Sequence, residues 1–167
     1  MKNKGFTLIE LLGVIIILSI IMLIAIPNVT STLENSKRTT YITDAKKMIT
    51  QTEYALRTNI EKPNSNEILK VTLADLGTND IEKDPDGDAY DLENSYVIVA
   101  RVDGFLTYYV NLVVDKGDGK LKGISLTSEE SLDELEKSAL VVNNLTLLTN
   151  NQIKQKICSS CTLITVN

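Results

Sequence analysis

The sequence of 167 residues contains no histidine and only two cysteines. Without an imidazole the chain cannot form a Ser-His-Asp triad, a Cys-His pair, a His-ligated zinc site or a phosphohistidine relay. An enzyme built from this chain would have to use carboxylates, lysine, tyrosine or the two cysteines. The length suits about one domain.

The apolar residues are concentrated near the N-terminus, where residues 11–26 carry no charged side chain. If the run starts at Phe6, a helix over it is about 31 Å long and matches the hydrocarbon core of a bilayer. A secretory signal peptide is the alternative, with Lys2 and Lys4 as its basic region. The residues after the run, Ile26-Pro27-Asn28-Val29, offer no small-x-small cleavage site, which favours a spanning helix.

Glu10 is the only charged residue in the apolar segment that starts at Phe6, and it needs a positive partner there. No lysine or arginine lies between Lys4 and Lys37. A new α-amino group could supply the charge if the chain were cut near Gly5, about one helical turn before Glu10. A neighbouring copy could then present its amine to this carboxylate.

The residues around Glu10 form the stretch Lys4-Gly5-Phe6-Thr7-Leu8-Ile9-Glu10-Leu11-Leu12. This stretch resembles the N-terminal motif of type IV pilins and of the pseudopilins of type II secretion. The resemblance implies that a prepilin peptidase cuts after Gly5 and methylates Phe6, and that Glu10 is the family's glutamate. The alternative is an ordinary single-pass anchor that happens to carry these residues.

The resemblance also implies a domain organisation. Residues 1–5 are the leader, 6–27 the hydrophobic transmembrane and assembly helix, 28–60 the amphipathic half of the same helix, and 61–167 an extracytoplasmic β-rich head. Pro27 falls where family members carry a helix-kinking proline. A local loosening there would let subunits lengthen or curve within a filament. Alternatively, Pro27 marks where the helix leaves the membrane.

The remaining sequence predicts an α+β fold of the type IV pilin kind, a long helix packed against an antiparallel meander. Apolar positions recur every three or four residues from Tyr41 to Ile60, and a turn at residues 62–66 ends the helix near residue 58. Strands are expected at 96–102 and 105–114, joined by Asp103-Gly104, and at 120–126. A short helix at 129–140 and a closing strand at 162–166 follow.

Four aspartates lie close together before the sheet, at Asp84, Asp86, Asp88 and Asp91. Oxygen ligands clustered on a turn suit calcium, although the spacing is not that of an EF-hand. A type I turn with Asp84 first and Gly87 fourth is the simpler interpretation. The pattern from Lys83 to Tyr90 resembles a loop of major pseudopilins and of several Gram-positive pilins, which favours the Gram-positive type.

Cys158 and Cys161 are the only sulfur pair. Outside the cytoplasm we expect them to form a disulfide, with free thiols as the second interpretation. A redox motif would need a helix that starts at the first cysteine, but the few residues after Cys161 are typical of a strand. A membrane-tethered thiol oxidoreductase is therefore the less favoured alternative.

Charge is divided along the chain, because residues 61–167 hold ten basic and eighteen acidic side chains, a net charge of −8. An acidic head does not attract a phosphate backbone, so no specific nucleic-acid partner is predicted. In an assembled filament Lys37, Arg38, Lys46 and Lys47 could be displayed differently.

These features together predict a non-enzymatic pilin that waits as a single-pass protein of the cytoplasmic membrane and becomes part of an extracellular type IV pilus. Its partners would be other copies in a helical filament, the prepilin peptidase, the membrane and the assembly platform. Adhesion and twitching motility are the functions that this class implies. The alternatives are a pseudopilin or minor pilin of a type II secretion-like or competence system, and a calcium-dependent adhesin. No cofactor is expected unless calcium binds.

Overall fold

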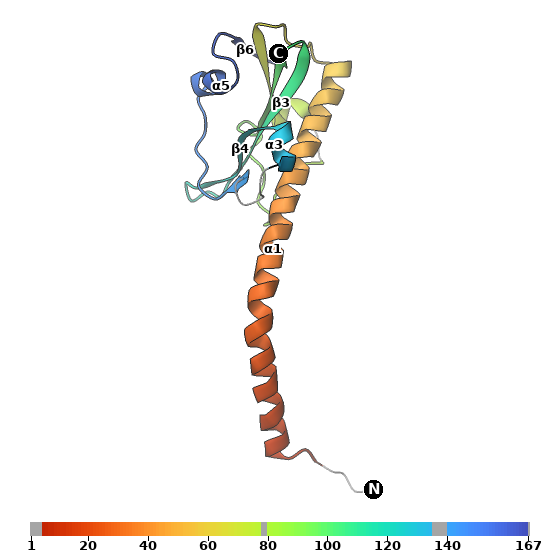
Figure 1. Ribbon diagram of the computed structural model, residues 1–167, viewed down its shortest axis with the longest axis vertical. Coiled ribbons are helices and arrows are strands. Elements are labelled where there is room, and N and C mark those ends of the chain that lie inside the picture. Colours follow the sequence, from red (N-terminus) through yellow and green to blue (C-terminus); the bar gives the residue numbers. More distant parts are fainter. Residues whose placement is uncertain (1–4, 78–79, 135–139, 167) are drawn as a thin grey trace. The chain divides into compact units, whose positions relative to one another are not determined.

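The computed structural model describes residues 5–77, 80–134 and 140–166. The chain divides into two compact units, residues 1–36 and residues 37–167, which are described separately below. One α-helix, α1 (Leu8–Thr58), contributes to both units (Figure 1). Its bounds confirm the long helix that the hydrophobic pattern predicts.

The second unit is built on a six-stranded sheet with the order β5-β4-β3-β2-β1-β6. Its strands are β1 (Glu67–Thr72), β2 (Tyr96–Val102), β3 (Phe105–Asp115), β4 (Leu121–Ser128), β5 (Val141–Val142) and β6 (Thr162–Thr165). Within the described residues, three short helices accompany them, α2 (Leu73–Leu76), α3 (Glu129–Glu134) and α5 (Asn150–Ile157).

The predicted hairpin is present. Val102 of β2 pairs with Phe105 of β3, and the antiparallel pairing continues to Tyr96 and Asn111. Asp103 and Gly104 have φ angles of 50° and 86°, as a tight hairpin turn requires. The third strand, β4, pairs antiparallel with β3 and completes the expected meander. The helix expected at 129–140 is described only as α3, since residues 135–139 lie outside the described residues.

The sheet is mixed, whereas the sequence predicts an antiparallel meander and a closing strand at 162–166 without a parallel pair. β1 pairs antiparallel with β2, and β6 pairs parallel with β1 so that Ile68 faces Leu163. The parallel pair joins segments almost a hundred residues apart, a contact that local sequence patterns do not reveal. The α+β class is confirmed, with β1, β5, α2 and α5 as additions to the prediction.

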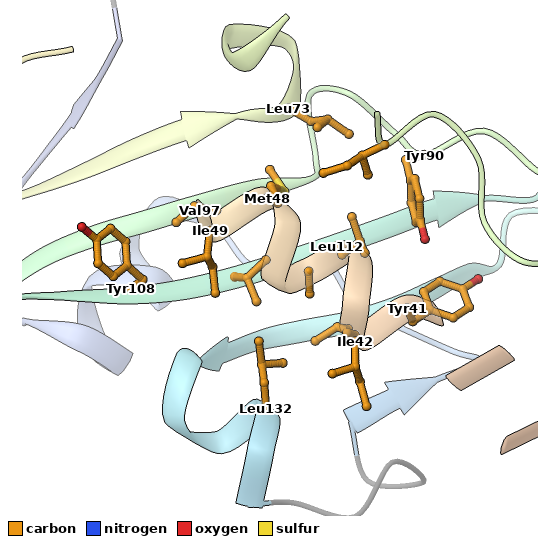
Figure 2. Close-up of a cluster of buried hydrophobic side chains, with 14 of the residues drawn as sticks. Tyr41, Ile42, Met48, Ile49, Leu73, Tyr90, Val97, Tyr108, Leu112 and Leu132 are labelled. Carbon is orange, nitrogen blue, oxygen red and sulfur yellow. The ribbon is translucent and has the colours of Figure 1, made fainter. Parts of the chain in front are cut away.

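The core of the second unit has two layers, one on each face of the sheet. On one face α1 buries Tyr41, Ala45, Met48, Ile49 and Leu56 together with alternate residues of β2 and β3 (Figure 2). On the other face Ile153 of α5 packs against the intervening residues of β2, which include Tyr96 and Ile98. Both faces of β2 are therefore buried, and its sequence is apolar at nearly every position.

Candidate assembly site

Glu10 lies in the first turn of α1 and is bonded to Thr7. The backbone amide and the hydroxyl of Thr7 both donate to Oε2 of Glu10, at 2.8 and 2.9 Å. The amide of Glu10 donates in return to the Thr7 hydroxyl at 3.3 Å. This reciprocal pair is a capping box, which satisfies amide groups that a helix N-terminus otherwise leaves unpaired.

Thr7 is the hydrogen-bond partner of Glu10, and the sequence contains a signal for this pairing. The pattern Thr-x-x-Glu ahead of an apolar run is the usual sign of a capping box. The bonds from Thr7 engage one carboxylate oxygen of Glu10, and no other described residue donates to this side chain. Its second oxygen, Oε1, accepts no hydrogen bond from any described residue.

The predicted processing site, Gly5-Phe6, lies ahead of α1 on backbone that is neither helix nor strand. Phe6 is 91% exposed, and no described atom lies within 4 Å of the position that a Cβ on Gly5 would occupy. A peptidase needs an accessible, non-helical peptide bond, and the backbone at Gly5-Phe6 meets both conditions in the described chain.

Among residues 5–36, no other segment covers the apolar part of α1. The large apolar side chains between Phe6 and Leu33 are between 48% and 91% exposed. The helix is long and apolar enough to cross a membrane, with a mean hydropathy of 3.0 over its most apolar window. An apolar surface of this extent requires lipid or other apolar chains around it.

The polar side chains along Leu8–Leu33 all form hydrogen bonds with their own helix or, in the case of Glu10, with the residue just before it. Glu10 bonds to Thr7, while Ser19, Asn28, Thr30, Ser31 and Thr32 donate to backbone carbonyls three or four residues earlier. α1 continues through Pro27, whose missing N–H leaves one carbonyl without its helical donor. A bend or loosening at Pro27 stays a prediction.

The aspartates proposed for calcium are spread over a turn. Asp84 is buried, and its Oδ1 accepts the amides of Asp86 and Asp88 at 2.9 Å, while its Oδ2 accepts the Tyr41 hydroxyl at 2.5 Å. The amide of Gly87 donates to the Asp84 carbonyl, which closes the expected turn.

Asp91, the last of the four, instead accepts the amides of Glu93 and Asn94 at 3.1 and 3.0 Å. Among the described residues no group of three or more acidic, cysteine or histidine side chains is placed to hold a metal ion.

Asp86 is surrounded by ammonium groups. It pairs with Lys37 of α1, with Lys122 of β4 at 2.5 Å and with Lys116 at 3.7 Å. Hydrogen bonds from Lys122 and Lys37 hold the pKa of this carboxyl well below its usual range.

Two further lysines of α1 also form ion pairs. Lys46 pairs with Asp133, and Lys47 pairs with Asp44 at 3.0 Å.

Cys158 and Cys161 are joined in a disulfide with a Cα–Cα distance of 5.4 Å. Cys158 caps the C-terminal end of α5, and Cys161 is buried against the second core layer. The pair therefore links the end of α5 to the start of β6. A reactive thiol is favoured at a helix N-terminus, which is the opposite position.

The N-terminal segment matches a known family model. Residues 1–26 match the family model described as the prokaryotic N-terminal methylation motif. This motif is the signature of type IV pilins and pseudopilins, and the chain carries it on a long apolar helix followed by an α+β unit. No curated protein and no solved structure matches the chain.

Proposed function

We propose that this chain is a structural subunit of a type IV pilus, cut between Gly5 and Phe6 and polymerised through α1. The observation that supports the proposal most directly is Glu10, a lone carboxylate on an exposed apolar helix close to the cleavage motif. Hydrolysis of the Gly5-Phe6 peptide bond would free the α-amino group of Phe6. In an assembled filament that amine would pair with Glu10 of a neighbouring copy.

The bonding of Glu10 is compatible with such a pair. Thr7 engages Oε2 and fixes the rotamer of the carboxylate, so an incoming amine can bond to Oε1 without breaking the capping box. Moving the apolar half of α1 from lipid into a bundle of like helices changes its hydrophobic burial little. Packing and the Glu10 pair would therefore select the register between subunits.

Replacement of Glu10 tests this mechanism. We expect Glu10→Ala to insert into the membrane normally and to abolish or disorder filaments, because the α-amine of a neighbour would lose its counter-charge. Glu34→Ala is a matched control, since Glu34 is an exposed carboxylate on the same helix outside the apolar run. Normal filaments from the Glu10→Ala variant, seen by electron microscopy, would remove the pair from the mechanism.

Processing is tested independently by mass spectrometry of the mature N-terminus. The expected result is a chain that begins at Phe6, with one methyl group on its α-amine. A polymerised chain that still carries Met1 would contradict the proposal.

A pseudopilin or minor pilin is the second candidate. The pattern Lys83-Asp84-Pro85-x-Gly87-x-x-Tyr90 favours it, because a similar loop precedes the sheet of major pseudopilins. The two candidates share processing and differ in the length of the fibre. Imaging of cells that overproduce the chain separates them, since long surface fibres composed of it indicate a major pilin.

We propose a structural rather than an enzymatic role. The main enzymatic alternative uses Cys158 and Cys161 as a redox pair. Its test is thiol labelling of the native chain with and without mild reductant. Cysteines that stay oxidised and unlabelled under mild reductant support the structural role. Cysteines that are reduced and labelled under mild reductant, and that form the disulfide again when it is removed, support the oxidoreductase.

A further inference from the structure

We propose that Asp86, Lys37, Lys116 and Lys122 form an electrostatic clasp that ties the acidic loop to α1 and to β4 without a metal ion. The acidic loop is defined here as residues 84–91. The clasp is a conformational device of the second unit, and its test is independent of pilus assembly.

The clasp joins three segments that are distant in the sequence. Lys37 lies on α1 and bonds to Oδ1 of Asp86, while Lys122 lies on β4 and bonds to Oδ2 at 2.5 Å. Lys116, in the turn between β3 and β4, lies 3.7 Å from Asp86 and 3.6 Å from Asp88. Each oxygen of Asp86 thus receives an ammonium group from a different element.

Lys122 is the most enclosed of the three lysines, with 14% of its side chain exposed. Its ammonium group also lies 5.1 Å from the centre of the Tyr41 ring. The Tyr41 hydroxyl donates to Asp84, the first residue of the acidic loop. A charge in this position is stabilised both by the carboxylate and by the face of the ring.

The remaining carboxylates of the acidic loop are already engaged, Asp88 by Lys116 at 3.6 Å. Asp84 accepts two backbone amides and the Tyr41 hydroxyl, and Asp91 accepts two backbone amides. A divalent cation at Asp86 would have to displace Lys37 and Lys122. The lysines therefore supply the positive charge that a calcium ion supplies in other acidic loops.

Because several ammonium groups surround Asp86, its loss should weaken the attachment of the acidic loop more than the loss of any one lysine. Without it, three ammonium groups would face one another with only the more exposed Asp88 nearby, at 3.6 Å from Lys116. Removal of one partner from a partly enclosed ion pair leaves an uncompensated charge, which costs more than the pair itself contributes. The loss of Asp86 should therefore weaken the attachment of the acidic loop to α1.

The test compares two aspartates of the same loop in the full chain, purified in detergent micelles. We expect Asp86→Asn to lower the Tm by about 5 °C, and the matched control Asp88→Asn to change it by about 1 °C or less. Wild-type chain should melt at the same temperature in EDTA and in millimolar calcium. A Tm that rises with calcium in the wild type but not in Asp86→Asn would overturn the proposal.

Two lysine variants cover the case in which Asp86→Asn does not fold. Lys37→Met removes the contact from α1 and keeps the length of the side chain, and Lys122→Met does the same from β4. We expect the loss of Tm in Lys37→Met to be smaller in 1 M salt, because salt screens the pair that it removes. In chains that fold, the effects of Lys37→Met and Asp86→Asn should not add. Additive effects, or a loss independent of salt in both lysine variants, would exclude the clasp.

Discussion

Two buried tyrosines in the core of the second unit donate hydrogen bonds from their hydroxyls to buried aspartates. Tyr41 donates to Asp84, and Tyr90 donates to Asp44 at 3.0 Å. The two rings meet edge to face with their centres 6.1 Å apart, and Figure 2 places them at one end of the cluster and Tyr108 at the other. Each aspartate is buried, and in each the tyrosine hydroxyl is the donor to Oδ2, while Oδ1 accepts from other groups.

Tyr41→Phe tests this dependence. The variant keeps the ring but leaves Oδ2 of Asp84 without its donor, and we expect a loss of about 1–3 kcal/mol in the free energy of unfolding. Tyr54→Phe is the control, because Tyr54 is 69% exposed. Denaturant titration of both variants measures the difference, and equal stability would show that Asp84 finds another donor.

Tyr96 makes the stability of the second unit sensitive to alkaline pH. Burial raises the pKa of Tyr96 to about 12, and burial with the adjacent aspartates raises the pKa of Tyr41 and Tyr90 as well. An unfolded tyrosine ionises near pH 10. The contribution of each buried hydroxyl is therefore present below about pH 10 and is lost as the pH rises through the folded-state pKa.

We expect the Tm of the wild-type chain to fall between about pH 10 and 12, and Tyr96→Phe to reduce that fall. The Tyr96 hydroxyl is buried without a hydrogen-bond partner among the described residues, so its removal should cost little at neutral pH. Thermal melts of both chains across this range provide the measurement. If the Tm of both chains falls by the same amount over this pH range, Tyr96 is not a cause of the fall.

At the scale of elements, the pairing of β3 with β4 depends on one glycine. The register of β3 shifts between Val110 and Leu112, and Gly123, which pairs with Val113 just beyond the shift, has a φ of 144°. A Cβ on Gly123 would lie 1.9 Å from the carbonyl oxygen of Leu112. A backbone atom cannot give way as a side chain can, so this position excludes every residue with a Cβ.

Gly123→Ala should therefore lower the free energy of unfolding by about 3 kcal/mol or more. Gly119→Ala is the control, because Gly119 has a φ of 79° but open space around it, and its loss should be about 1 kcal/mol. Denaturant titration measures both. Similar losses in the two variants would mean that backbone conformation, rather than the clash with Leu112, determines the cost.

The elements predicted well from sequence are those whose signals are local. The hairpin at Asp103-Gly104 and the end of α1 follow from turn residues and from the spacing of apolar positions. α5 is missed although Thr149 and Gln152 form a capping box that the sequence displays. β1 is also missed, because part of its support is a parallel pair with β6 at the far end of the chain.

The site shows the same division between local and distant information. Glu10 is identified from the sequence because an acid in an apolar run is unusual, and Thr7 could be identified from the capping pattern. The lysines around Asp86 could not be identified in this way. They come from positions 37, 116 and 122, and only the packing of α1 and β4 brings them to one carboxylate.

At the scale of the whole molecule, charge argues against nucleic acid as a partner of the single chain. Residues 61–167 carry a net charge of −8, and three of the lysines on α1 pair with aspartates of their own unit. Phosphate contacts would have to break these pairs and overcome the repulsion of the head.

We therefore expect no retardation of duplex DNA by the full chain in detergent at physiological salt, measured by gel mobility. Lys46→Gln should behave as the wild type does. Retardation that decreases steeply as salt is added would show that the basic residues of α1 are available to phosphates.

The hydrogen bonding of the polar side chains on the apolar helix has a consequence for motion between subunits of the proposed filament. Between Leu8 and Leu33 the hydroxyl and amide side chains are all turned back onto their own carbonyls. A neighbouring helix that packs there meets hydrocarbon almost everywhere, and hydrocarbon surfaces slide past one another without exchanging directional bonds. In the proposed filament such helices would therefore shift along one another without breaking hydrogen bonds, and the pair between Glu10 and the α-amine of a neighbour would be the directional contact that limits this movement.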